Sequence, residues 1–127
     1  MKWKLNSNAP VYSQLVDIIT MDILKGEYIM GEKFKSVRDI ASEAKVNPNT
    51  MQKALVELEN KGLLISNGTL GRIVTEDASV IERLKLEIIE NNVYDFLKTM
   101  QKLNVTKQEV IEIISKQEID YEANSGN

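Results

Sequence analysis

The sequence predicts a mainly α-helical fold with a small β-hairpin: an N-terminal winged helix-turn-helix, then a short C-terminal helical tail that dimerises. Helix-capping signals recur up to residue 62, and a glycine-containing turn between two short apolar runs follows them. Residues 1–76 carry 10 basic and 9 acidic side chains (net +1), whereas residues 77–127 carry 6 and 10 (net −4). This split predicts a winged domain over 1–76, a two-helix dimerisation region over 77–120 and a flexible tail over 121–127.

The first helix is expected to begin at Pro10, whose missing N–H and restricted φ suit a first helical position. Asn8 or Ala9 would then be the cap. Gly26 is a typical helix stop, and residues 27–34 are expected to form a loop with a short strand. One apolar face recurs at three- and four-residue spacing: Tyr12, Leu15, Val16, Ile19 and Ile23.

Two further helices are expected close together. Ser36 is a good N-cap for a short helix, with Asp39 at its third position. After a tight connection, Asn47 caps the next helix and Pro48 occupies its first position. Residues 63–65 and 72–75 read as strands around the turn at 66–71. This order of elements is that of a winged helix-turn-helix.

The tail is expected to hold one long helix from Ala78 to Leu103, where Asn91 and Asn92 mark either a bend or a polar layer. Thr106 and Glu109 form a capping box that starts a last helix. The long helix has an apolar stripe that a short helix cannot cover, which favours a symmetric homodimer. The residues assigned to dimerisation are Ile81, Leu84, Ile88, Val93, Phe96, Leu97 and Met100.

The helix that begins after Asn47 carries the chemistry expected of a recognition helix. In a helix-turn-helix, the first residues of the second helix lie nearest the base edges of the major groove. Asn and Gln can bond bidentately to adenine, and Lys can reach guanine or phosphate. The candidates are Asn47, Asn49, Thr50, Gln52 and Lys53. The alternative is that Asn47 only caps the helix and that the polar face is merely solvated.

Several motifs together resemble a known family. They are Pro10-x-Tyr12-x-Gln14-Leu15, Gly26-x-Tyr28-x-x-Gly31-Glu32, Ser36-Val37-Arg38-x-Ile40-Ala41 and Val46-Asn47-Pro48-Asn49-Thr50-Met51-Gln52-Lys53-Ala54-Leu55. In this order and spacing, over roughly residues 8–75, they are similar to the GntR family of bacterial repressors. The stretch from Asn47 to Ala54, together with the short helical tail, is most similar to its YtrA subfamily.

The resemblance implies roles for individual residues. The family's Ser-x-Arg motif touches DNA, which points to Ser36 and Arg38, although a surface ion pair of Arg38 with Asp39 or Glu43 is the alternative. The family's wing reaches the minor groove or flanking phosphates, which implies roles for Gly68, Thr69, Gly71 and Arg72. Phe34-Lys35 replaces the family's Leu-Pro before this motif, so the start of the short helix is expected to be less rigid. The wing also departs from the family, because it ends in Gly71-Arg72-Ile73-Val74 instead of the usual Gly-x-Gly-Thr-Phe-Val.

The resulting hypothesis is a sequence-specific regulator, most simply a repressor, that binds double-stranded DNA as a homodimer on a palindromic operator. A link to a transporter operon is implied by the resemblance alone. The identity of any small-molecule effector stays open. The tail of about 50 residues is too small for an enclosed pocket of ~300 Å³, so an effector would bind at the dimer interface.

Composition excludes several other classes. The chain has no Cys and no His, which removes disulfides, thiolate metal sites and the usual general base. We expect no metal, no cofactor and no enzymatic activity. No apolar run approaches the roughly 20 residues that cross a bilayer, so a cytoplasmic protein without a membrane partner is expected. The near-neutral charge of residues 1–76 leaves a protein-interaction module as the second hypothesis.

Overall fold

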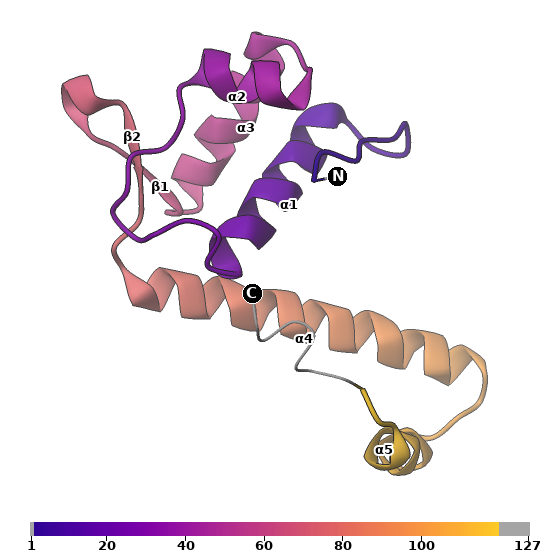
Figure 1. Cartoon of the computed structure of the whole chain (residues 1–127). Coiled ribbons are helices and arrows are strands. Elements are labelled where there is room, and N and C mark those ends of the chain that lie inside the picture. Colours follow the sequence, from indigo (N-terminus) through magenta and orange to yellow (C-terminus); the bar gives the residue numbers. More distant parts are fainter. Residues whose placement is uncertain (1, 120–127) are drawn as a thin grey trace. The chain divides into compact units, whose positions relative to one another are not determined.

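The computed structural model describes residues 2–119 and confirms a mainly α-helical fold with one small hairpin (Figure 1). The elements are α1 (Val11–Leu24), α2 (Val37–Ala44), α3 (Pro48–Asn60), β1 (Leu64–Ser66), the 3₁₀ turn η1 (Gly68–Leu70), β2 (Arg72–Val74), α4 (Ala78–Lys102) and α5 (Lys107–Lys116). The chain consists of two compact units, one up to Leu86 and one from Glu87. The tail predicted at 121–127 lies outside the described residues.

The first helix begins one residue later than the sequence predicts. Pro10 is the N-cap rather than the first helical residue, because its ψ of 140° is extended and Val11 is the first residue in helical conformation. The assignment of Asn8 or Ala9 as the cap was therefore wrong. The end agrees with the prediction, since Gly26 follows the helix with a φ of 86°, in the left-handed region that glycine adopts most easily.

The caps predicted for the helix-turn-helix are confirmed. The Ser36 hydroxyl accepts a hydrogen bond from the Asp39 backbone N–H at 3.1 Å. The Asn47 side chain accepts one from the Asn49 N–H at 2.7 Å, with Pro48 as the first helical residue. Each cap satisfies a backbone donor that the helix itself leaves unpaired. The turn between α2 and α3 passes through Lys45, which adopts a left-handed φ of 59°.

The core of the first unit is built around α3. Both α1 and α2 pack against α3, and α3 also contacts β1. Burying these apolar faces provides the main stabilising term for helices that are too short to be stable alone. Phe34, in the loop before α2, is also buried. The largest fully buried side chains are Leu15, Ile19, Ile40, Met51, Leu55, Leu58, Leu63, Leu64 and Val74.

The wing is an antiparallel pair in which Leu64 lies opposite Val74 and Ser66 opposite Arg72. The loop over residues 27–34 runs beside β2 and forms a single bridge, Lys33 with Ile73, rather than a strand. The Phe34 N–H donates to the Arg72 carbonyl at 2.8 Å. This backbone bond joins the segment that leads into α2 to the wing.

Helix α4 runs without interruption through Asn91 and Asn92. The Asn92 side-chain amide donates to the Ile88 carbonyl, four residues earlier, at 2.8 Å. The predicted capping box before α5 is confirmed, because Thr106 Oγ1 accepts from the Glu109 N–H and Glu109 Oε1 accepts from the Thr106 N–H.

In the second unit, α5 lies beside the later part of α4. Val110 is buried there, and an open groove of about 430 Å³ has Tyr94, Leu97 and Val110 among its lining residues. Within residues 2–119, no helix combines the length and apolar character that crossing a membrane requires.

Candidate nucleic-acid interface

The outward face of α3 carries the polar side chains predicted for base recognition. Asn49, Gln52 and Lys53 are exposed, and Thr50 is half-buried. The opposite face is fully buried and packs in the core through Met51, Ala54, Leu55 and Leu58. Helix α3 therefore presents amide and ammonium groups to solvent while its apolar face fixes its orientation. Such donors and acceptors can pair with base edges in a major groove.

Asn47 lies at the start of the same helix and is exposed. Its amide oxygen accepts the capping hydrogen bond from Asn49, so the capping role proposed as an alternative for this residue is present. A contact between the Asn47 side chain and DNA stays a prediction.

The first turn of α2 exposes both residues of the Ser-x-Arg motif. Ser36 caps the helix, and Arg38 is exposed. Arg38 takes part in none of the ion pairs found among residues 2–119. Glu43, one of its suggested partners, is bound instead to Lys35 and to the Trp3 indole. The guanidinium of Arg38 is thus available to a phosphate, which it can bind through two parallel hydrogen bonds.

A cavity of about 550 Å³ lies between the start of α2 and the wing. It brings together residues that are distant in sequence, namely Ser36 from α2 and Thr69, Gly71 and Arg72 from the wing. Lys33 and Lys35 also line this cavity, although they were not among the interface residues predicted from the sequence. The alternation around buried Phe34 could have revealed them, because neighbours of an inward residue in an extended segment point outward.

Two wing glycines lie where the chain reverses. Gly71 has a φ of 81°, and a Cβ added at Gly68 or Gly71 would meet open space. The glycine at 71 is thus required by the backbone conformation and not by crowding. Thr69, between them, is exposed. The tip of the wing is therefore open enough to approach the minor groove of DNA.

Arg72 has a role inside the domain that the sequence did not indicate. Its Nε and Nη2 atoms both donate to Glu59 Oε1 on α3, at 3.1 and 2.9 Å. Both side chains are largely buried, at 18% and 26% exposure. This ion pair links β2 of the wing to α3. A contact of Arg72 with DNA stays a prediction and would have to involve a guanidinium that is already paired.

The seven residues assigned to dimerisation all lie on α4, but they differ in exposure. Val93 and Phe96 are exposed, whereas Leu84 is buried within the single chain. The other four are half-buried, namely Ile81, Ile88, Leu97 and Met100.

The family model described as bacterial regulatory proteins, gntR family, matches residues 11–74. The HTH-type transcriptional regulator YhcF of Bacillus subtilis (strain 168) is 33% identical over 109 residues, which cover 86% of this chain and 90% of that protein. The HTH-type transcriptional repressor YtrA of the same organism is 36% identical over 72 residues, 57% of this chain and 55% of YtrA.

The solved structure of a GntR family transcriptional regulator from Listeria monocytogenes is similar over 90% of this chain and 100% of its own, with a TM-score of 0.82 and 34% identity. The family match spans α1, α2, α3 and the wing. This chain therefore belongs to the gntR family of bacterial regulatory proteins, within its YtrA-like group, and is a DNA-binding transcriptional regulator rather than an enzyme.

Proposed function

We propose that this regulator is a homodimeric repressor that binds a palindromic operator through α3 and the wing, and that it controls a transporter operon. Specific DNA contact is supported by the exposed polar face of α3 and by Arg38, which is exposed and in none of the ion pairs found within residues 2–119. YtrA of Bacillus subtilis, one of the relatives above, is named a repressor. The assignment to a transporter operon rests on the YtrA-like resemblance alone.

One observation supports the proposed dimer. Helix α4 exposes a row of apolar residues whose sequence spacings alternate between three and four. Exposure is 55% at Leu86, 57% at Ile89, 50% at Val93 and 44% at Phe96. The row continues through half-buried Met100 to Leu103. This is the heptad pattern of a coiled-coil seam, which a second identical helix covers with its own seam. Left in water, such a continuous apolar row would promote association.

The proposed seam changes the set of dimerisation residues. Val93, Phe96 and Met100 are retained, and Leu86, Ile89 and Leu103 join them because the same row exposes them. The remaining four lie off this row on the helix: Ile81, Leu84, Ile88 and Leu97. Of these, Leu84 is already covered by its own chain.

A two-fold dimer would present two copies of α3 to successive major grooves, about 34 Å apart. Asn49 and Gln52 would read base edges, while Arg38 and Lys33 would neutralise phosphates. Because phosphate neutralisation releases counterions, affinity should fall steeply with salt.

The test is selection of bound sequences from a random DNA pool, with the purified protein at moderate salt. We expect an enriched inverted repeat whose half-sites are about one helical turn apart. Arg38→Ala and Gln52→Ala should each weaken binding to that repeat while the helical content stays unchanged. Placing the repeat over a promoter should lower reporter expression when the protein is present. Failure to enrich any sequence would favour a protein-interaction module, and increased expression would exclude a repressor.

A further inference from the structure

The N-terminal arm, residues 2–9, has no helix or strand, yet side chains hold it in place. The Gln14 amide on α1 forms three hydrogen bonds with it. Gln14 Nε2 donates to the carbonyls of Asn6 and Ala9 at 2.8 and 2.7 Å, and Gln14 Oε1 accepts from the Asn6 N–H at 2.9 Å. These bonds fold the arm back so that its first residues run along the domain.

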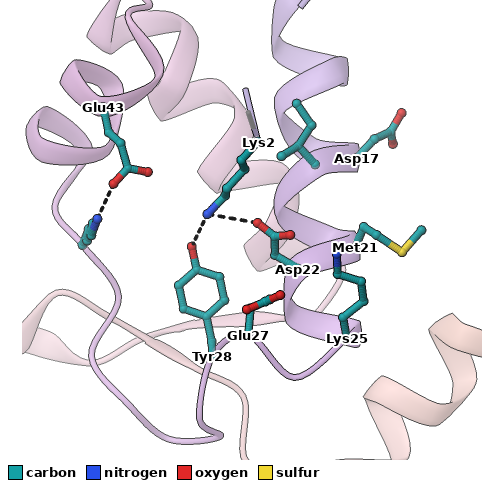
Figure 2. Close-up of a pocket in the computed structure, with 10 residues that line it drawn as sticks. Lys2, Asp17, Met21, Asp22, Lys25, Glu27, Tyr28 and Glu43 are labelled. Carbon is teal, nitrogen blue, oxygen red and sulfur yellow. Dashed lines mark hydrogen bonds and ion pairs between the residues drawn. The ribbon is translucent and has the colours of Figure 1, made fainter. Parts of the chain in front are cut away.

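Lys2 fastens the arm to α1 and to the loop before α2. Its ammonium lies 2.9 Å from Asp22 Oδ2 and donates to the Tyr28 hydroxyl at 3.2 Å (Figure 2). Asp22 is buried at 8% exposure, and a buried carboxylate is costly unless a cation accompanies it. Burial lowers the pKa of Lys2, but the hydrogen bonds to Asp22 and Tyr28 outweigh it and raise that pKa above its ordinary value.

Trp3 fastens the arm to α2. Its indole N–H donates to Glu43 Oε2 at 2.9 Å. The other carboxylate oxygen of Glu43 pairs with Lys35, which directly precedes the N-cap Ser36. One carboxylate therefore connects the arm, the last turn of α2 and the segment that leads into α2. The hydrogen bond from Lys35 lowers the pKa of Glu43, so this group stays charged at neutral pH.

These contacts matter because α2 is short and packs on α3 through one narrow apolar face. It has only eight residues and buries only Ile40, Ala41 and Ala44. Within this unit, the main helix partner of both α1 and α2 is α3. The arm adds a link between α1 and α2: Gln14 and Asp22 anchor it on α1, and Glu43 receives it on α2.

We propose that Lys2 and Trp3 are positioning residues for DNA binding: they strap α2 to α1 and thereby hold the Ser36–Arg38 turn in register with α3. This inference rests on the proposed role of α2 and α3 at the operator. Neither residue has to touch DNA. The arm acts through helix placement, so its loss should lower affinity without removing any phosphate contact.

Salt dependence separates this role from a direct contact. A lysine that neutralises a phosphate contributes about 0.9 to the slope of log affinity against log salt. A positioning lysine contributes nothing to that slope. Lys4 is a matched control, because it lies on the same arm, is exposed and forms none of the ion pairs found among residues 2–119.

The experiment compares the full chain with Lys2→Met, Lys2→Arg, Trp3→Phe and Lys4→Met on the operator recovered by selection, with affinity measured at several salt concentrations. We expect Lys2→Met and Trp3→Phe to weaken binding three- to ten-fold with an unchanged salt slope. Lys2→Arg should restore affinity to within about two-fold, and Lys4→Met should behave as the parent.

Amide hydrogen exchange of α2, measured without DNA, should accelerate in Lys2→Met and Trp3→Phe but not in Lys4→Met. This measurement tests whether the arm holds α2 in place, even if the unaltered chain binds no selected sequence. Such a failure to bind would count against the proposed function alone. Unchanged α2 exchange in both variants would overturn the inference. So would a salt slope reduced by about one in Lys2→Met, because it would identify a phosphate contact.

Discussion

The ammonium of Lys53, on the outward face of α3, lies 3.8 Å from the centroid of the Tyr12 ring in the first turn of α1. An ammonium over an aromatic face is attracted by the negative potential of the ring, by about 0.5–1 kcal/mol at exposed sites. The ring therefore holds a flexible lysine at a defined place beside the recognition face.

We predict that Tyr12→Leu weakens operator binding about two- to five-fold, the factor that corresponds to this attraction. Tyr12→Phe is the matched control, since it keeps the aromatic face and removes only the hydroxyl. Fluorescence anisotropy with labelled operator measures both. Equal affinities for Tyr12→Leu and Tyr12→Phe would show that the ring does not position Lys53.

The ion pair between Arg72 and Glu59 should stabilise the domain. Because its two hydrogen bonds are largely shielded from water, we expect Arg72→Met to lower the free energy of unfolding by about 1 kcal/mol. Urea denaturation followed by circular dichroism measures the change. Arg38→Met is the control, because Arg38 is exposed and has no ion-pair partner in the described part of the chain. Its unfolding should match the parent while its operator affinity falls. A similar loss of stability in both variants would argue against the pair.

The seam on α4 should be sensitive to charge. Val93→Asp or Phe96→Asp would bury a carboxylate in the proposed interface without a partner, so we predict monomers at micromolar concentration. Asn91→Asp adds the same charge to an exposed position on the opposite side of the helix and should leave the dimer intact. Light scattering after size exclusion gives the mass of each. Dimers of Val93→Asp and Phe96→Asp would place the interface elsewhere.

Acid should release the N-terminal arm. Hydrogen bonding to Lys35 lowers the pKa of Glu43 from its ordinary value of 4.5, so this carboxylate stabilises the fold above that value. The contribution is lost as the pH falls through the lowered pKa. Trp3 is the only tryptophan, and its fluorescence should change as the pH falls below 4.5. Glu43→Gln should remove this transition, and an identical acid titration in that variant would contradict the assignment.

At high pH the dependence has the opposite direction, because the lysine ion pairs lose their stabilising effect as the pH rises. Hydrogen bonds raise the pKa of Lys2 and of Lys35, so their ion pairs stabilise the fold below the ordinary lysine value of 10.5. These contributions are lost as the pH rises through the raised values. The arm should therefore stay docked across the whole neutral range.

Local signals predicted the helix starts correctly where the stabilising contact lies within a few residues. Ser36 with Asp39 and Thr106 with Glu109 are such cases, because a cap is made between neighbours in sequence. The start of α1 was missed by one residue, since proline suits both the cap and the first helical position and only ψ distinguishes them.

Contacts between distant residues could not be predicted in this way. Trp3 and Glu43 are 40 positions apart, and Arg72 and Glu59 are 13 apart. Whether a polar side chain meets a partner depends on how α1, α2 and the wing pack on α3. Composition and periodicity do not contain that information.

The amino-acid order alone established the capped helices, the wing and the polar face of α3, because each follows from local backbone and amphipathic rules. Tertiary packing decided which individual side chains are paired or buried and which stay exposed. It paired Arg72 with Glu59, left Arg38 exposed, covered Leu84 and exposed Val93. Two apolar residues on one helix are equivalent in a periodic pattern, and they become different only when neighbouring elements bury one of them.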